Sequence, residues 1–351
     1  RRDDVVVNPC YPYPVQHVLS SITLIDPSRI PVAVLALVLV ALAGVLTGAM
    51  RGNANPFFWN LTDGVFGSMG ARLDRRERKA SDLVFRGFFL TVFGLVFAWL
   101  LGNAAAKLAH QNELYGLTET LLLSFALTGG AVWHALLKLY RALKLKQVGK
   151  GAYYTIARST RVDLSGTDDF GITRAGMGYA ARAFDKGAVA PVFWFLLCGL
   201  PGAYVYAVLA ALAWRFGKDN FTKGFGKVPL ALEQLMGFAP HILSGVLVAF
   251  AGLFTPTGGM ARAFNGLLNR KSRAAYAEGG LPLTAMAYSL NVSIGGPVVD
   301  LDGSVMKRAW IGPDGVTAQL DAGHLRRALY ICLMAYLLFI ASLCGAVVWA
   351  G

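Results

Sequence analysis

The chain has little charge for its size and few residues suited to metal or redox chemistry. Charged residues make up 15% of its 351 residues, against about 25% in an average soluble protein. Hydrophobic residues make up 55%, and the mean hydropathy is +0.51. This composition excludes a disordered chain and argues against a large soluble catalytic domain. The four cysteines show no CxxC or Cys/His spacing, so no zinc or redox centre is expected.

The common catalytic motifs are also missing. The sequence contains no GxxxxGK[ST], no HExxH and no GxSxG, which removes the usual signatures of P-loop enzymes, zinc proteases and α/β-hydrolases. The five histidines are scattered over different parts of the chain. Asp300 to Gly303 has a faint likeness to a calcium loop, but the later ligands of such a loop are absent.

What the sequence does have is long apolar runs. A helix that crosses a bilayer needs about 20 mostly apolar residues. Six runs meet this length and predict an all-α integral membrane protein of about six spans: Ile30–Met50, Leu83–Ala106, Leu114–Leu137, Gly187–Trp214, Leu235–Thr255 and Ala328–Ala350.

The basic residues test this count, because cytoplasmic loops are enriched in Lys and Arg. If all six runs cross, segments 51–86, 137–186 and 257–327 share one side and carry 25 of the 33 Lys and Arg residues. This asymmetry predicts a multi-pass protein of the bacterial inner membrane, with large cytoplasmic loops and both termini outside. It also accounts for the net charge of +13 without nucleic acid.

The charge pattern gives four regions: an extracytoplasmic segment 1–29, a transmembrane region 30–256, a cytoplasmic unit 257–327 and a last span 328–351. The fourth run is interrupted by Gly199-Leu200-Pro201-Gly202. A chain reversal there would leave two arms too short to cross, so a kinked single span is predicted.

The cytoplasmic loops show local signals. A charged helical stretch is expected at 72–79, and a basic amphipathic helix at 137–146. Asp168 and Asp169 precede the apolar-periodic run Ile172–Phe184 and predict a helix N-cap. A β-hairpin is expected within 297–315, where Val298-Val299 and Ala309-Trp310-Ile311 flank turn residues.

Several segments of the chain have a recognisable pattern, and the most specific is the central stretch Ala190-Pro-Val-Phe-Trp-Phe-Leu-Leu-Cys-Gly-Leu-Pro-Gly-Ala203. The others are Gly52–Pro56, Arg158-Ser-Thr160 with Asp163-Leu164, Phe225-Gly226, Gly279-Gly-Leu-Pro282, Ala285-Met-Ala287 and Gly295-Gly-Pro297. Together these segments resemble the CobD/CbiB family of membrane adenosylcobinamide-phosphate synthases, with the AmpE-type signalling proteins as distant kin.

The resemblance implies an ATP-dependent amide-forming reaction, with Mg²⁺ and phosphates held by carboxylate and amide side chains. Several positions where such side chains are expected carry other residues here: Gly178, Arg182 and Ala183 on one helix, Ala210 and Ala213 on the next, Glu233-Gln234 and Glu278. An arginine in place of a carboxylate reverses the local field at a Mg²⁺ site.

Three functional hypotheses follow. The first is a catalytically degenerate relative that serves as an accessory, scaffold or signalling subunit, needs no cofactor, and contacts membrane lipid and other membrane proteins. Its helix-packing residues would be Gly199, Gly202, Ala203, Ala207 and Ala210. The second is an active synthase that uses Mg-ATP with Arg158, Asp163, Asp185, Lys186 and Glu233. The third is a small-solute transporter built around the broken fourth span.

Overall fold

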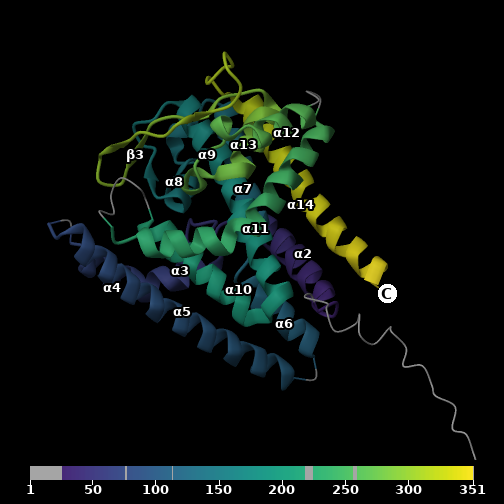
Figure 1. Ribbon diagram of the computed structural model, residues 1–351. Coiled ribbons are helices and arrows are strands. Elements are labelled where there is room, and N and C mark those ends of the chain that lie inside the picture. The colour runs from purple at the N-terminus through teal and green to yellow at the C-terminus, as the bar shows by residue number, and fades with distance from the viewer. Residues whose placement is uncertain (1–25, 76, 113, 218–223, 256–258, 351) are drawn as a thin grey trace, which may run out of the picture.

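The structure is a computed structural model, and it describes residues 26–75, 77–112, 114–217, 224–255 and 259–350. Most of segment 1–29 therefore lies outside the described residues. The described part is all-α with a few very short strands, as predicted. Figure 1 shows α5, α6 and α10 at one end of the molecule, and α8, α9, α12, α13 and β3 at the other. These are called the far end and the loop end below.

Apolar helices form the body of the molecule. Five helical runs in the described part of the chain are long and apolar enough to cross a membrane. They are α2 (Arg29–Thr47), α5 (Ala80–His110), the run formed by α9 (Asp169–Phe184) and α10 (Ala190–Phe216), α11 (Lys227–Ala251) with its continuation to Phe254, and α14 (Ala322–Ala350).

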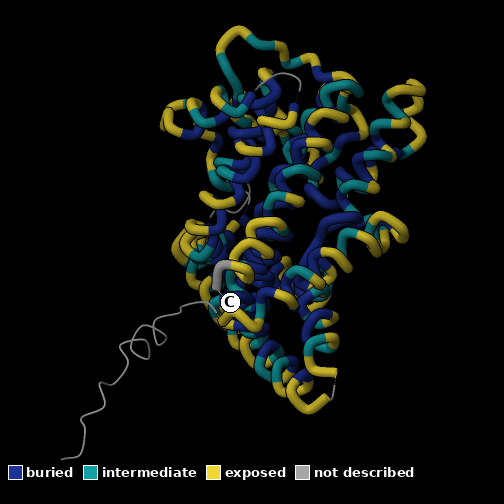
Figure 2. The backbone as a smooth tube through the Cα atoms, turned by 90° about the vertical axis from the view of Figure 1, so that its right-hand side faces the viewer, coloured by how far each residue is buried: buried dark blue, intermediate teal, exposed yellow. Residues whose placement is uncertain are grey.

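Three predicted spans are confirmed as single long helices: α2, α5 and α14. Their outward faces carry exposed apolar side chains such as Leu46, Phe93 and Trp99. Figure 2 shows buried segments in the middle of the molecule and exposed segments along its periphery. Apolar faces of this kind are expected where helices meet hydrocarbon, so the chain is a membrane protein by its structure as well as its composition.

The third predicted span is wrong in detail, because the helix breaks at 125–129 into α6 (Tyr115–Ser124) and α7 (Gly130–Lys144). The break is stabilised by its neighbours. The Thr128 N–H donates to the Gly187 carbonyl at 2.7 Å, and the Thr128 hydroxyl donates to the Ala54 carbonyl at 2.6 Å. Non-helical backbone is tolerated at membrane depth when other elements satisfy it in this way.

The fourth predicted span is also wrong: α10 is a helical hairpin rather than one kinked span. Lys186, just before α10, and Tyr206, within it, bind the two oxygens of one Glu233 carboxylate. In a straight helix, residues 20 positions apart are separated by about 30 Å. The chain therefore reverses between them, at Gly199, whose backbone is not helical (φ 67°, ψ −159°).

The sequence interpretation rejected a reversal because each arm would be too short to cross the membrane. The two arms of a hairpin do not have to cross it, so their length does not exclude a reversal. Gly199 has a positive φ that favours glycine, and Pro201 begins the second arm with its φ already set. The Arg29 guanidinium donates to the Leu196 carbonyl at 3.3 Å at the end of the first arm. Gly102 of α5 lies so close to Pro201 that a Cβ atom there would be 2.5 Å from the Pro201 Cα.

The fifth predicted run forms α11, but its contacts lie toward the loop end. Glu233 contacts Lys186 and Tyr276, His241 contacts Leu281, and Gly252 packs against Ser289. Figure 1 shows α11 above the lower parts of α5, α6 and α10. The predicted length and apolarity are therefore present, whereas the expected course from one end of the molecule to the other is not.

Shorter helices complete the fold. At the loop end lie α8 (Tyr154–Thr160), α12 (Met260–Leu268) and α13 (Gly280–Leu290), whereas α3 (Phe57–Thr62) and α4 (Ser68–Leu73) lie beside α10 and α5 (Figure 1). Two π-helical turns follow α3 and α9, at Asp63–Gly67 and Asp185–Val189. Single 3₁₀ turns occupy Val148–Lys150, Gly252–Phe254, Arg270–Ser272 and Tyr276–Glu278. The charged stretch expected at 72–79 is helical only as far as Leu73 in α4.

The N-cap prediction is confirmed, because the Asp168 carboxylate accepts the Gly171 N–H at 2.8 Å at the start of α9. The predicted hairpin is right only in its first half. β3 (Val298–Asp300) pairs with β4 (Val305–Met306), and β1 (Val162–Asp163) joins the other side of β3. β5 (Trp310–Ile311) pairs instead with β2 (Ile294–Gly295).

Candidate functional site

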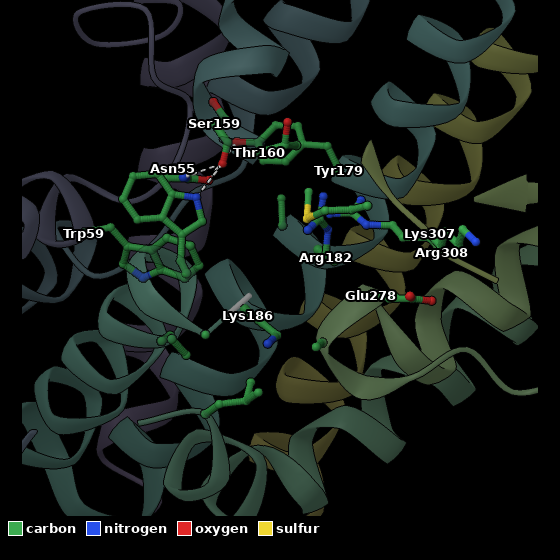
Figure 3. Close-up of a pocket in the computed structure, with 18 residues that line it drawn as sticks. Asn55, Trp59, Ser159, Thr160, Tyr179, Arg182, Lys186, Glu278, Lys307 and Arg308 are labelled. Carbon is green, nitrogen blue, oxygen red and sulfur yellow. Dashed lines mark hydrogen bonds between the residues drawn. The ribbon is translucent and has the colours of Figure 1, made fainter. Parts of the chain in front are cut away.

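A cavity of about 320 Å³ lies between α3, α8, α9, the second arm of α10 and the segments around β4 and Glu278. Figure 3 shows its two unlike walls, one aromatic and hydroxyl-bearing, the other basic. The residues that line it are Asn55, Trp59, Ser159, Thr160, Tyr179, Arg182, Ala183, Lys186, Ala210, Ala213, Trp214, Gly217, Leu230, Ala277, Glu278, Met306, Lys307 and Arg308.

The basic wall carries four cations and a single carboxylate. Arg182 and Lys186 come from the end of α9 and the turn after it, while Lys307 and Arg308 follow β4. Arg182 donates its Nε–H to the Gly178 carbonyl at 3.4 Å. The charges of Arg182 and Arg308 repel each other. Burial lowers the pKa of the Arg308 guanidinium below its usual value, and the nearby Glu278 carboxylate opposes this effect.

The opposite wall is held in place by hydrogen bonds that converge on Ser159. The Ser159 carbonyl accepts from the Trp214 indole at 2.7 Å and from the Asn55 amide at 3.0 Å, as the dashed lines in Figure 3 show. The Tyr179 hydroxyl donates to the Asn55 side-chain oxygen at 3.1 Å. The Trp59 and Trp214 ring centroids lie 5.8 Å apart. These shared partners fix the wall before any ligand arrives.

Behind this wall, Arg161 lies with its guanidinium carbon 5.3 Å from the centroid of the Trp214 ring. Its backbone is left-handed (φ 57°), which ends α8 and turns the chain into β1. Burial, with the nearby charge of Arg215, lowers the pKa of Arg161 to about 10. Arg161 therefore supports the aromatic wall without lining the cavity.

The floor of the cavity contains a buried ion pair. Lys186 donates to the Glu233 carboxylate at 2.9 Å, and the Glu233 side chain is completely buried. The Tyr276 and Tyr206 hydroxyls donate to the other Glu233 oxygen at 2.7 and 3.1 Å. The Lys186 ammonium also lies 4.3 Å from the centroid of the Tyr276 ring. The charge of Lys186 is thus neutralised inside the protein.

Asp185 does not line the cavity and belongs to a buried cluster next to the Glu233 pair, since the His241 and Tyr276 ring centroids lie 4.7 Å apart. Its two oxygens bind the His241 ring and the Ser244 hydroxyl. The other ring nitrogen of His241, Nε2, accepts the Leu281 backbone N–H at 2.9 Å. A nitrogen that accepts carries no proton, so the proton lies on Nδ1 and His241 is neutral in this arrangement. Because both ring nitrogens of His241 are hydrogen-bonded within the protein, the Asp185–His241 pair holds neighbouring elements together and is poorly placed to act as a general base.

The other candidate residues are scattered. Arg158 is exposed on α8, and the Asp163 carboxylate accepts the Ser165 N–H at 2.9 Å; neither lines the cavity. Of the five catalytic candidates, the structure therefore brings together only Lys186 and Glu233. The expected helix-packing residues on α10 are buried within this chain, among them Gly202, Ala203, Ala207 and Ala210.

The positions at which the resemblance leads us to expect polar side chains converge on the cavity. Arg182, Ala183 and Glu278 line it. Ala210 and Ala213, three residues apart and therefore on one helix face, line it too. Gly178 lines a smaller adjoining pocket that shares Arg182 and Arg308 with the cavity. Arg182 does not fill the space, and Phe184 lies elsewhere, beside Tyr336.

Other lining residues were not predicted from the sequence. Lys307 and Arg308 are adjacent basic residues after a strand, and Trp59 and Trp214 lie in apolar surroundings, so neither pair carries a motif. Tyr276, which binds Glu233, sits in a short 3₁₀ turn with no signature of its own. Of these residues, Trp214 lies on the second arm of α10, after the reversal that the sequence interpretation had rejected.

The cavity offers few carboxylate ligands to the metal of a Mg²⁺–nucleotide complex. Mg²⁺ is bound through carboxylate and other oxygen ligands with octahedral geometry. The cavity offers one carboxylate, Glu278, among four cations. Across the residues that the structure describes, no group of three or more His, Cys, Asp or Glu side chains is placed to hold a metal ion.

The chain was compared with models of known protein families. The model of the family described as CobD/Cbib protein matches residues 31–332. The chain belongs to the CobD/CbiB family. The matched residues run from α2 to the first part of α14.

The curated relatives of this CobD/CbiB member are divergent. The cobalamin biosynthesis protein CobD of Brucella anthropi is 27% identical over 64% of this chain and 70% of its own length. That of Brucella suis biovar 1 is 25% identical over 62% and 67%, and that of Rhodobacter capsulatus is 30% identical over 57% and 62%. No solved structure gives a significant match.

Proposed function

We propose that this chain is a catalytically degenerate CobD/CbiB-family protein of the bacterial inner membrane, acting as an accessory, scaffold or signalling subunit of a membrane assembly. The observation that carries the proposal is the basic wall of the cavity. Four cations and one carboxylate line the place where the family's reaction calls for oxygen ligands to Mg²⁺.

The physical reason is the sign of the local field. A Mg²⁺ ion near Arg182 and Arg308 would be repelled by these two cations, which the Glu278 carboxylate in the cavity and the nearby Asp300 offset in part. Ala210 and Ala213 add no ligand from the facing helix. Lys186 is held by Glu233 and so is not available to a nucleotide at its full charge.

An active synthase is the second candidate, and two observations favour it. The cavity is open rather than filled by side chains. In addition, the relatives of this chain in Brucella anthropi and Rhodobacter capsulatus bear the name of cobalamin biosynthesis proteins. This reading requires Glu278, Glu233 and Lys186 to support Mg-ATP in an unusual arrangement.

The decisive experiment measures cobinamide-phosphate formation by the purified full-length protein with ATP and Mg²⁺, beside the Rhodobacter capsulatus relative as a control. We expect product from the relative and none above background from this chain. Product formation that is lost in Glu278→Gln, but kept in the exposed control Glu77→Gln, would establish the synthase instead.

A complementary experiment restores oxygen ligands. The triple variant Arg182→Glu, Ala210→Asn, Ala213→Asp removes one cation and adds three oxygen-bearing side chains around the cavity. We expect it to gain Mg²⁺ binding that the wild type lacks, as measured by calorimetry. Equal Mg²⁺ binding by both proteins would contradict the proposal that this chemistry has been lost.

The fold supports one membrane orientation within this proposal. With α10 folded back and α11 at the loop end, segment 215–234 joins the other basic segments, which then carry 29 of the 33 Lys and Arg residues. This exceeds the asymmetry for six crossings. We infer a cytoplasmic loop end and cavity, with both chain termini outside.

A further inference from the structure

One face of α11 and its continuation to Phe254 is exposed and apolar. Large side chains recur along this face at helical spacing. They are Leu235, Phe238, Ile242, Phe250 and Leu253, called the outer stripe below. Between Val228 and Phe254 the only ionisable side chains are Glu233 and His241, and both are buried. A face of this size without charge calls for a cover of hydrocarbon or protein rather than water.

The opposite face of α11 fixes the direction of the outer stripe. Glu233 and His241 are eight residues apart and therefore share a helix face. Glu233 binds Lys186 there. His241 binds Asp185 and the Leu281 N–H. Turning α11 to hide the stripe would break the buried ion pair of Glu233 and leave a charge without compensation. The stripe therefore stays on the outside.

Both ends of α11 lie toward the loop end. At its start, Gly226 packs against the Phe216 carbonyl, where the second arm of α10 ends. At its other end, Gly252 packs against Ser289 of α13 (Figure 1). The reversal of α10 lies on the opposite side, beside Gly102. A helix of 25 residues is about 37 Å long and could cross a bilayer, so it is the course of α11 that keeps it from crossing.

We propose that α11 dips into one leaflet of the membrane without crossing it, and that its outer stripe binds the acyl chains of the phospholipids in that leaflet. This inference goes beyond the proposed function and does not depend on it. Its support is continuity with the hydrocarbon-facing surface of the crossing helices. α11 packs against both α5 and α14, whose outward faces are apolar and exposed, so the stripe continues that surface between them.

The length of the outer stripe favours lipid over a partner protein. From Leu235 to Leu253 the stripe extends over about 27 Å, at 1.5 Å per residue. Because both ends of α11 lie on one side, a crossing helix of a partner would meet α11 at a steep angle. Such a helix is about 10 Å wide and would cover about a third of the stripe. Acyl chains can cover all of it, as they do for helices that lie at a membrane interface.

The test measures what surrounds the stripe in a bilayer. In a full-length variant without its native cysteines, Phe238→Cys, Ile242→Cys and Leu253→Cys each carry a nitroxide spin label, and the protein is placed in phosphatidylcholine nanodiscs. We expect each label to collide with oxygen, which concentrates in hydrocarbon, several-fold more often than with a water-soluble nickel chelate. Phe93→Cys on the exposed face of α5 should behave in the same way, and Glu77→Cys should show the reverse preference.

A preference for the nickel chelate along the stripe would place it in water and overturn the proposal. Low collision rates with both reagents would show that protein covers the stripe, either a second copy of this chain or another partner, and would overturn it equally. If one labelled variant fails to fold, Ala239→Cys replaces it, because Ala239 is exposed on the same side of α11.

A second measurement separates dipping from crossing. In sealed vesicles, Lys227→Cys at the start of α11 and Lys271→Cys shortly after α12 are treated with an impermeant maleimide. We expect both to react from the same side of the membrane. Reaction from opposite sides would mean that α11 crosses, which would refute the proposal even if the stripe contacts lipid. Neither measurement depends on catalysis, so a synthase activity would refute the proposed function and leave this inference standing.

Discussion

At the scale of single residues, the Lys186–Glu233 pair shows how burial changes the value of a charge. Glu233 is completely buried and receives hydrogen bonds from one lysine and two tyrosines. A pair of this kind is worth little as a net gain over apolar packing, but removing one partner leaves a buried charge without compensation.

Glu233→Gln should therefore lower the free energy of unfolding by about 3 kcal/mol, because Lys186 keeps its charge and loses its counter-ion. The measurement is the thermal or denaturant midpoint in mild detergent. Glu77→Gln, at an exposed position, is the matched control and should have little effect. Adding Lys186→Met to Glu233→Gln should recover part of the loss, and no recovery would mean that the ion pair is not the cause.

The cap at Asp168 gives a second residue-scale prediction. Its carboxylate accepts the Gly171 N–H at the start of α9, the helix that carries Arg182 into the cavity. Asp168→Ala should cost about 1 kcal/mol of stability, whereas Asp168→Asn keeps the acceptor and should cost much less. Equal losses in the two variants, measured by unfolding, would show that the cap hydrogen bond does not matter.

Sequence alone could reach only part of this residue-scale picture. The Asp168 cap was predictable because a cap and its helix are adjacent in the chain. The partnership of Lys186 with Glu233 was not, because the two residues are 47 positions apart and meet through the fold of α10 and α11. Likewise, Asp185 was a reasonable catalytic candidate by its position, yet His241 and Ser244 occupy both of its oxygens.

At the scale of elements, hydropathy located the long apolar helices but not their paths. α2, α5 and α14 agree with the sequence because a continuous apolar run is sufficient to specify them. The breaks at 125–129 and at Gly199 depend on contacts from distant residues, such as Arg29 with Leu196 and Thr128 with Gly187. A length criterion applied to one segment at a time cannot include such contacts.

The reversal in α10 makes a direct topological prediction. In a variant without its native cysteines, Lys227→Cys at the start of α11 should react with an impermeant maleimide from the same side of the membrane as Lys150→Cys. Lys107→Cys, at the end of α5, should react from the opposite side. A single kinked crossing predicts the reverse for Lys227→Cys, so labelling it from the side of Lys107→Cys would refute the hairpin.

At the scale of the whole molecule, the small residues of α10 are already buried inside the chain, among them Gly202, Ala203 and Ala207. The facing helix α5 contributes Gly94 and Gly102 to the same contact. A partner protein must therefore dock elsewhere, and α5 presents an exposed apolar face that includes Phe85, Phe93 and Trp99. Lipid or another membrane helix fits this face equally well in chemistry.

A stable-subunit role predicts a complex. Extracted from its native membrane in mild detergent, the protein should have a native mass above that of the 37.6 kDa chain with its detergent, measured by mass spectrometry or light scattering. Phe93→Ala on the exposed face of α5 should weaken the association if that face is the contact, and Val65→Ala on another exposed surface should not. A monodisperse monomer would contradict the subunit role.

The contacts that hold the reversal in α10 suggest an order in which the helices assemble during synthesis. Arg29 contacts Leu196 and Gly102 contacts Pro201 at this reversal, and both Arg29 and Gly102 precede it in the chain. During synthesis from the N-terminus, their helices are therefore available before residues 190–216 leave the ribosome. The α10 hairpin can therefore insert between α2 and α5 after these two helices have formed. Substitutions at Arg29 or Gly102 should then arrest folding when α10 is inserted, and not before.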